Sequence, residues 1–257
     1  MHELIEIPVG DATAEAYVAR PDTTSDKALP GVLLFIDAIG LRPVIAQMAD
    51  RMASWGYVVL APNIFYRLGT AQETSPDRPL TEPGAREEFF KEMMPRVGGY
   101  TPNLSGPDTD AWLTALAHQP GVAAGKVGVT WYCMGARLAT RAAGDHPDVV
   151  AAVGGFHGGG LVTDEPDSPH HSLSRARADF VYLHADADPS MPAAAIAALG
   201  DSLAAHGLRA SNEVALGAPH GYTMADTSMY HEEGAEQHFR ELEGLFARTL
   251  GVSSNDD

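Results

Sequence analysis

The chain has 257 residues, enough to form one α/β domain with a complete hydrophobic core. It contains 34 acidic and 17 basic residues, and a surface with a formal net charge of −17 repels nucleic acid and anionic lipid. No apolar run is long enough to span a bilayer, and the N-terminus lacks the basic stretch and apolar core of a secretory signal. We therefore expect a single domain over residues 1–257 that is cytoplasmic, a monomer or a homodimer, and without nucleic-acid or membrane partners.

Cys133 is the only cysteine in the chain. An internal disulfide is therefore impossible, and so is a zinc site built from several cysteines. We expect no metal and no other cofactor. A lone cysteine is most often a buried apolar side chain, so only its surroundings can indicate a chemical role.

Short apolar runs alternate with stretches of helical periodicity along most of the chain. The run 31–36 (GVLLFI) is typical of a strand buried on both faces, and 42–55 has apolar residues at helical spacing before Gly56. In chain order the expected elements are strands at 3–8, 13–19 and 31–36, a helix at 42–55, a strand at 57–62, a helix at 107–118, a strand at 126–132, a helix at 135–145, strands at 149–156 and 179–183, a helix at 192–206, a strand at 211–216 and a helix at 231–250. This alternation predicts an α/β fold with a mostly parallel central sheet and helices on both faces.

Residues 68–105 show no clear strand and are too numerous for a simple connection. A long irregular segment inside a compact domain is typical of a lid or a binding insertion. We expect this lid to cover a pocket at the carboxyl ends of the strands. Its candidate apolar contacts are Phe89, Phe90, Met93 and Met94.

A nucleophilic, an acidic and a basic side chain each follow a predicted strand. Cys133 lies between a strand and a helix, which is the position of a nucleophile elbow. The segment HADAD (184–188) supplies a carboxylate, and His220 follows the last strand. Ligands bind at the carboxyl ends of such strands, and the order nucleophile, acid, histidine is that of α/β-hydrolases. The sequence therefore predicts an α/β-hydrolase fold with its site at that edge of the sheet.

Either aspartate of the HADAD segment is a candidate for the acid. We favour Asp188 over Asp186 because of the position of Pro192 after it. Other polar clusters are interpreted as structural. The run 157–160 (HGGG) is expected to be a flexible turn after a strand, and 170–171 (HH) an exposed polar loop.

Several segments of the chain resemble the dienelactone hydrolase family, the cysteine-dependent branch of the α/β-hydrolases. They are DAIGLRP (37–43), APNIFYR (61–67), YCMGARLA (132–139), DADPSMP (186–192) and HGY (220–222). The resemblance implies a triad of Cys133, Asp188 and His220, and an oxyanion hole formed by the backbone N–H groups of Ile39 and Met134. It also implies hydrolysis of small esters or lactones through a cysteine acyl-enzyme, with His220 relaying protons.

Three positions differ from the family pattern. Trp131 stands where glycine is usual, Ala38 at the position of a glutamate that helps to activate the thiol, and Met224 at that of a substrate-binding arginine. Asp37 is a candidate stand-in for the glutamate, and a lid arginine for the missing arginine. The side chains expected to contact substrate are Asp37, Trp131, Tyr132, Tyr222 and Met224.

Two other functions stay open at this point. One is a non-catalytic ligand-binding or regulatory member of the same fold with an altered nucleophile elbow, which Trp131 and Ala38 favour. The other is a redox-sensing role for Cys133, although the chain has no second cysteine to resolve an oxidised thiol. In a hydrolase, His220 and the helix N-terminus would both favour a thiolate–imidazolium pair at rest.

Overall fold

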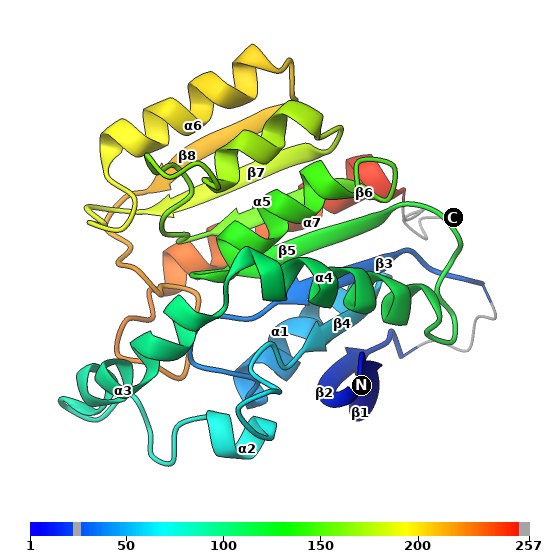
Figure 1. The fold of residues 1–257 in the computed structure, drawn as a ribbon, viewed down its shortest axis with the longest axis horizontal. Coiled ribbons are helices and arrows are strands. Elements are labelled where there is room, and N and C mark those ends of the chain that lie inside the picture. Colours follow the sequence, from blue (N-terminus) through cyan, green and yellow to red (C-terminus); the bar gives the residue numbers. More distant parts are fainter. Residues whose placement is uncertain (23–26, 252–257) are drawn as a thin grey trace.

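An eight-stranded sheet runs through the centre of the molecule (Figure 1). The computed structural model describes residues 1–22 and 27–251. The strand order is β1-β2-β4-β3-β5-β6-β7-β8; β1 pairs with β2 and β2 with β4 antiparallel, and the other neighbours pair parallel. The strands are β1 (His2–Val9), β2 (Ala12–Ala19), β3 (Gly31–Phe35), β4 (Val58–Pro62), β5 (Val127–Tyr132), β6 (Val150–Phe156), β7 (Asp179–Ala185) and β8 (Ala210–Ala215).

Helices cover both faces of this sheet (Figure 1). On one face α1 and α7 lie together, and Arg51 of α1 forms an ion pair with Glu236 of α7. On the other face α4 and α5 contact each other. The helices are α1 (Pro43–Ser54), α2 (Ala71–Thr74), α3 (Ala85–Gly99), α4 (Pro102–Ala117), α5 (Gly135–Asp145), the 3₁₀ helix η1 (Pro169–Arg175), α6 (Ala193–Ala205) and α7 (Glu232–Leu250). The predicted α/β fold, with a mostly parallel sheet between two layers of helices, is confirmed.

The central strands β3, β4 and β5 are buried along their whole length. Because helices cover both faces here, no residue of these strands can alternate toward water, and the sequence reads as continuous apolar runs. Burying a Leu, Val or Phe side chain contributes roughly 1.5–3 kcal/mol to folding, so these strands supply much of the core. The parallel pairing also brings the loops after β3, β5, β6, β7 and β8 to the same edge of the sheet.

The segment between β4 and α4 is more regular than predicted. It contains α2 and α3, and α4 begins at Pro102, whereas the predicted helix begins at residue 107. A proline in the first turn lacks only an N–H that would be unpaired there, so Pro102 suits the start of a helix. The helix then continues through Pro107, which is why a boundary placed at that proline is wrong.

A buried carboxylate in α4 ties this segment to the domain. Asp108 is fully buried and accepts hydrogen bonds from the hydroxyl groups of Tyr66, at 2.9 Å, and Tyr100, at 2.8 Å. Arg67 donates two further bonds to it, at 2.6 and 2.8 Å. Each carboxylate oxygen therefore has a donor, as burial of a charge requires.

Part of the segment 68–105 packs at the carboxyl edge of the sheet. Its residues Leu80 and Ala85 form a small apolar cluster with Ile39, which follows β3. Leu80 also forms an isolated bridge with Thr227, in the loop between β8 and α7. This part of the segment therefore lies on the side of the sheet that carries the predicted site, and its role as a lid stays a prediction.

The apolar side chains expected in this lid have different positions. Phe89 and Phe90 pack against the Ile39 cluster, and Met93 is buried. Met94 is 54% exposed, so it does not contribute to this packing.

Candidate active site

Three side chains from the loops after β5, β7 and β8 form a continuous series of contacts. Nε2 of His220 lies 3.1 Å from the sulfur of Cys133. Nδ1 of the same ring lies 2.5 Å from Oδ2 of Asp188. A thiol, an imidazole and a carboxylate in this arrangement can move a proton between sulfur and nitrogen.

Cys133 occupies a tight turn between β5 and α5. Its φ of +55° lies in the left-handed region, which is uncommon for a residue with a side chain. The turn packs closely on β3, because a Cβ at Gly135 would lie only 3.0 Å from the carbonyl oxygen of Ile36. The backbone N–H of Cys133 donates to the carbonyl of Phe156 on the neighbouring strand. These contacts fix the cysteine at the N-terminus of α5, where the helix dipole favours a negative charge.

Asp188 is nearly completely buried and is held by two kinds of donor. Its Oδ1 accepts from the backbone N–H of Ser190, at 2.8 Å, and from the hydroxyl of the same residue, at 2.7 Å. Burial alone would raise the pKa of Asp188, but the hydrogen bond and the charge of His220 outweigh it, so the pKa is lowered. The alternative acid, Asp186, instead accepts from the N–H of Gly217 at 2.8 Å. The geometry therefore favours Asp188.

His220 has a strongly raised affinity for a proton. Burial opposes the charged ring, but the negative charge of Cys133 and the contacts with Asp188 outweigh it and raise the pKa of His220 to about 10. Cys133 and Asp188 therefore both favour the protonated form of His220.

Two backbone N–H groups near the cysteine are free to bind an anion. Neither the N–H of Ala38 nor that of Met134 makes a hydrogen bond within residues 1–22 and 27–251. The N–H of Ile39, expected from the sequence to be a donor, points to Oδ1 of Asp37 at 3.0 Å. The N–H of Ile39 is therefore engaged by Asp37 in this structure, and the expected pair of oxyanion donors, Ile39 and Met134, stays a prediction.

Asp37 is buried and does not reach the cysteine. Its two carboxylate oxygens bind the guanidinium of Arg42, at 2.6 and 3.0 Å, and Arg42 also binds Asp226 of the loop after His220. Burial alone would lower the pKa of Arg42, but the charges of Asp37 and Asp226 outweigh it and raise that pKa above its usual value. The ion pair of Asp37 with Arg42 thus stabilises the loop after β3. Both carboxylate oxygens of Asp37 are engaged by Arg42, which contradicts the expected contact of Asp37 with substrate.

Trp131 fills a space that two glycines leave open. A Cβ at Gly155 would lie 1.9 Å from the indole, and a Cβ at Gly158 would lie 2.4 Å from it. The ring is fully buried and packs near Tyr182, with a distance of 5.9 Å between ring centroids. The expectation that Trp131 contacts substrate is therefore corrected, because the indole belongs to the core between β5, β6 and α5.

The remaining side chains expected to contact substrate are also buried. Tyr132 is fully buried, and its hydroxyl lies 3.2 Å from Nε2 of His238 in α7. Tyr222 is fully buried and donates to the carbonyl of Leu183 at 3.0 Å. Met224 is 1% exposed. Each of these side chains packs the core beneath the site, which corrects the prediction of a direct contact.

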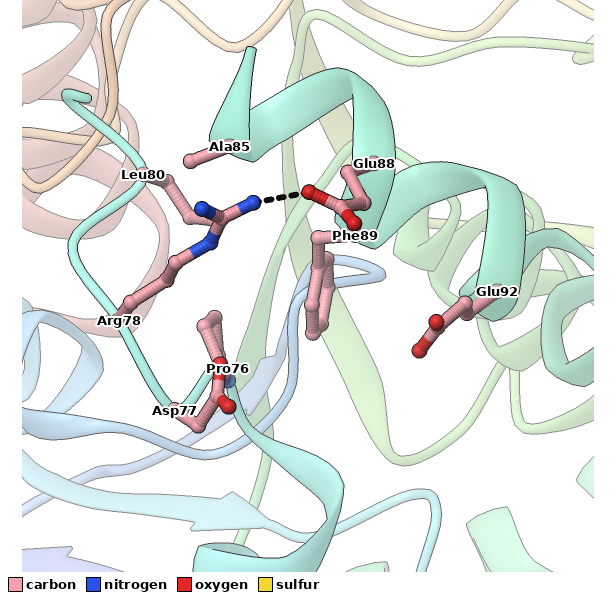
Figure 2. A pocket seen from close by; sticks show the side chains of 8 residues that line it. All are labelled: Pro76, Asp77, Arg78, Leu80, Ala85, Glu88, Phe89 and Glu92. Atoms are coloured by element: carbon pink, nitrogen blue, oxygen red, sulfur yellow. Dashed lines mark hydrogen bonds and ion pairs between the residues drawn. The ribbon is translucent and has the colours of Figure 1, made fainter. Parts of the chain in front are cut away.

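The arginines near the lid already have contacts in their own neighbourhood. Figure 2 shows Arg78 directed toward Glu88, with which it forms an ion pair, in the wall of a cavity of about 350 Å³ formed by residues 76–92. The other contacts are Arg67 with Asp108, Arg86 over the ring of Phe90 at 4.6 Å, and Arg96 with the carbonyl of Thr74 at 3.2 Å. A lid arginine as a replacement for the missing one stays a prediction.

A second cavity, of about 240 Å³, borders the residue after the cysteine. It is lined by Met134 and Arg137 of the α5 region, by Tyr100 after α3, and by Gly160 after β6. Its position next to Met134 makes it a candidate space for part of a substrate.

One residue of this site escaped the sequence analysis. His157, interpreted as the start of a flexible turn, is fully buried with its ring 5.4 Å from that of His220. The signal that could have found it is its place directly after β6, next to the strand that carries the cysteine. The pair at 170–171 lies in the first turn of η1, where Nδ1 of His170 is 2.7 Å from the hydroxyl oxygen of Ser168.

No group of three or more His, Cys, Asp or Glu side chains within 1–22 and 27–251 is arranged to hold a metal ion. None of the helices in the described part of the chain combines the length and apolar character needed to cross a bilayer.

Comparison with known proteins gives consistent matches. The model of the dienelactone hydrolase family matches residues 14–250. Two proteins named provisionally as carboxymethylenebutenolidases, from Salmonella typhi and Methylorubrum extorquens, are 25% and 26% identical to this chain. The alignments cover 96% and 97% of this chain, and 87% and 81% of those proteins.

Solved structures share the fold. A dienelactone hydrolase-like promiscuous phosphotriesterase from metagenomic libraries superposes with a TM-score of 0.80 at 20% identity, covering 98% of this chain and 99% of that one. Dienelactone hydrolase from Anabaena variabilis gives a TM-score of 0.64 at 19% identity, covering 97% and 98%. These identities support the fold alone, whereas the family match spans nearly the whole sequence. The chain therefore belongs to the dienelactone hydrolase family and is a hydrolase of the α/β-hydrolase fold.

Proposed function

We propose that this hydrolase cleaves small carboxylic esters or lactones through an acyl-enzyme formed on Cys133. The observation that carries the proposal is the unbroken series of contacts from the sulfur through His220 to Asp188. The names of the curated relatives denote action on a butenolide, which is a cyclic ester. A small molecule is therefore the expected partner of the site.

In the first half-reaction, the sulfur of Cys133 attacks the acyl carbon of the substrate. The sulfur lies 3.1 Å from Nε2 of His220, so transfer of the thiol proton to that nitrogen gives the thiolate needed for attack. Collapse of the tetrahedral intermediate breaks the carbon–oxygen bond. The leaving alkoxide takes the proton from Nε2 of His220, and in a lactone it stays attached to the acyl group.

In the second half-reaction, water cleaves the thioester. Nε2 of the now neutral His220 takes a proton from water as the hydroxide adds to the acyl carbon. The carbon–sulfur bond then breaks, releasing the acid and restoring the thiolate beside the imidazolium. Asp188 keeps Nδ1 of His220 protonated and oriented throughout, because its Oδ2 accepts that hydrogen bond.

The negative oxygen of each tetrahedral intermediate needs two donors. We assign these to the backbone N–H groups of Ala38 and Met134, which have no partner in the described part of the chain. The ion pair of Asp37 with Arg42 supports the first donor by holding the loop after β3. Losing one donor of this type typically raises the barrier by about 3 kcal/mol.

The altered nucleophile elbow does not favour a non-catalytic role. The indole of Trp131 lies over Gly155 and Gly158, so it fits without separating Cys133 from His220. No observation specifically supports a binding module or a redox sensor. Cytoplasmic location, a monomer or homodimer, and the absence of nucleic-acid partners stay predictions.

The direct test is hydrolysis of a panel of p-nitrophenyl esters and unsubstituted lactones by the wild type and two variants. We expect Cys133→Ala to lose at least about a thousandfold in kcat/KM, because it removes the sulfur that lies at Nε2 of His220. Arg240→Gln, which changes an exposed charge on α7 far from the site, is the control and should keep wild-type activity. Undiminished turnover by a folded Cys133→Ala variant would rule out the covalent mechanism.

A further inference from the structure

Backbone strain gathers at three neighbouring strand ends. In the described ranges 1–22 and 27–251, the non-glycine residues with a positive φ are Cys133 at +55°, Ala187 at +51° and His157 at +40°. They follow β5, β7 and β6, respectively, which are adjacent in the sheet. Such conformations cost free energy and persist mainly where function requires them. The first two position the cysteine and Asp188, whereas the proposed function gives His157 no role.

Within the described part of the chain, the side chain of His157 makes one hydrogen bond, and its partner lies in the loop that carries His220. Its Nε2 lies 2.7 Å from Oγ1 of Thr223, and both side chains are buried. Its Nδ1 is buried and has no partner among the described residues. Thr223 lies three positions after His220 in the chain. The bond therefore fastens the catalytic histidine's loop to the end of β6.

The ring of His157 also supports His220 directly. The two rings meet edge to face, with 5.4 Å between their centroids. On other sides His157 faces Tyr222, at 5.1 Å, and Tyr132, at 5.9 Å. A neutral ring can pack in this way beside an imidazolium, whereas a second cation would repel it.

Burial keeps the ring of His157 neutral. It is the main cause that lowers the pKa of His157 well below the usual value, and the positive charges of His220 and Arg86 lower it further. No carboxylate contributes to offset these charges. His157 therefore stays an uncharged support at the pH at which His220 carries its proton.

We propose that His157 and Thr223 form a clamp that positions the imidazole of His220 between Cys133 and Asp188. His157 is a positioning residue, because it acts through the ring and the loop of His220. The inference rests on the proposed triad. Loosening the clamp should slow the chemical steps and leave substrate binding unchanged.

The test compares Thr223→Val with Thr223→Ser. Valine keeps the shape of threonine but cannot bond to Nε2 of His157, whereas serine keeps the hydroxyl. We also use His157→Asn, because asparagine tolerates a positive φ but is too short to maintain the same contact. Each variant is assayed for kcat and KM on an activated ester, and for the rate of alkylation of Cys133 by iodoacetamide between pH 5 and 9.

We expect Thr223→Val and His157→Asn to lower kcat by about tenfold with little change in KM, as loss of one buried hydrogen bond implies. Alkylation of Cys133 near pH 6 should also be slower in these two variants. Thr223→Ser should keep both kcat and the alkylation rate near the wild-type values. The double variant Thr223→Val/His157→Asn should be no slower than the slower single variant, because both changes break the same bond.

Two results would overturn the clamp. One is an alkylation profile of Thr223→Val within twofold of wild type at every pH. The other is a double variant whose loss equals the product of the two single losses. The alkylation assay needs no ester turnover, so it tests the clamp even if Cys133→Ala proves as active as wild type and the proposed function fails.

Discussion

The charge of His220 should depend on the sulfur of Cys133. The two atoms are 3.1 Å apart, and opposite unit charges at this distance attract by about 5 kcal/mol at an effective dielectric constant of about 20. The His220 side chain is 25% exposed, so solvent screening reduces this figure. Even half of it corresponds to about 2 pH units. Replacing Cys133 by Ala should therefore lower the pKa of His220 from about 10 by at least roughly 2 pH units.

NMR titration of the imidazole measures this directly. The resonance of His220 is identified by its absence in His220→Gln, and its midpoint is compared in wild type, Cys133→Ala and Cys133→Ser. Serine keeps a hydrogen-bonding group without the negative charge, so its midpoint should fall as in the alanine variant. A midpoint in Cys133→Ala within half a pH unit of wild type would refute the reasoning and assign the raised pKa to Asp188.

The same pKa predicts how stability depends on pH. His220 has a higher pKa in the folded protein, about 10, than in the unfolded chain, about 6.5. Its contribution to the free energy of unfolding is therefore fully present below pH 6.5 and is lost as the pH rises through 10. The difference in stability between wild type and His220→Gln should shrink over that interval. A constant difference from pH 6 to pH 10 would contradict the assignment.

Two further changes test the packing around the site. Arg42→Met should destabilise the protein by about 3–5 kcal/mol in urea denaturation, because it leaves the buried carboxylate of Asp37 without its partner; a loss below about 1 kcal/mol would contradict this. Gly155→Ala should cost about 1–3 kcal/mol by pushing a methyl group into the indole of Trp131. Trp131→Phe should relieve part of that cost, and an unchanged penalty in the double variant would show that the indole is not the obstacle.

The fold was predictable because its signals are local. Runs such as 31–36 and 57–62 show burial on both faces directly, and β3 and β4 occupy these positions. Proline is a weaker signal. The boundary placed at Pro107 is wrong because the helix starts at Pro102 and continues through it.

The core of the site was also predictable, because chain order and strand ends place Cys133, Asp188 and His220 together. The choice between Asp188 and Asp186 depends on one turn, in which Ala187 takes a positive φ. A sequence shows two aspartates but not which one faces the imidazole. The structure supplies that difference.

Which side chains contact substrate could not be predicted from their proximity to Cys133 in the sequence. Trp131 and Tyr132 precede the cysteine, but strand residues point alternately to the two faces of a sheet, and here both faces are covered. Ile39 was expected as an oxyanion donor from the family resemblance, and its N–H donates to Asp37 in this structure. His157 was missed because a following run of three glycines suggests a flexible turn rather than a buried ring.

The central claim is that Cys133 carries the acyl group during turnover. An activated ester with a slowly hydrolysed acyl group is mixed with the enzyme and quenched in acid within one turnover, and the peptides are analysed by mass spectrometry. We predict a mass increase equal to the acyl group on the peptide that contains Cys133, absent in Cys133→Ala. Turnover of the ester with no adduct on that peptide, or an adduct on another residue that persists in Cys133→Ala, would contradict the account.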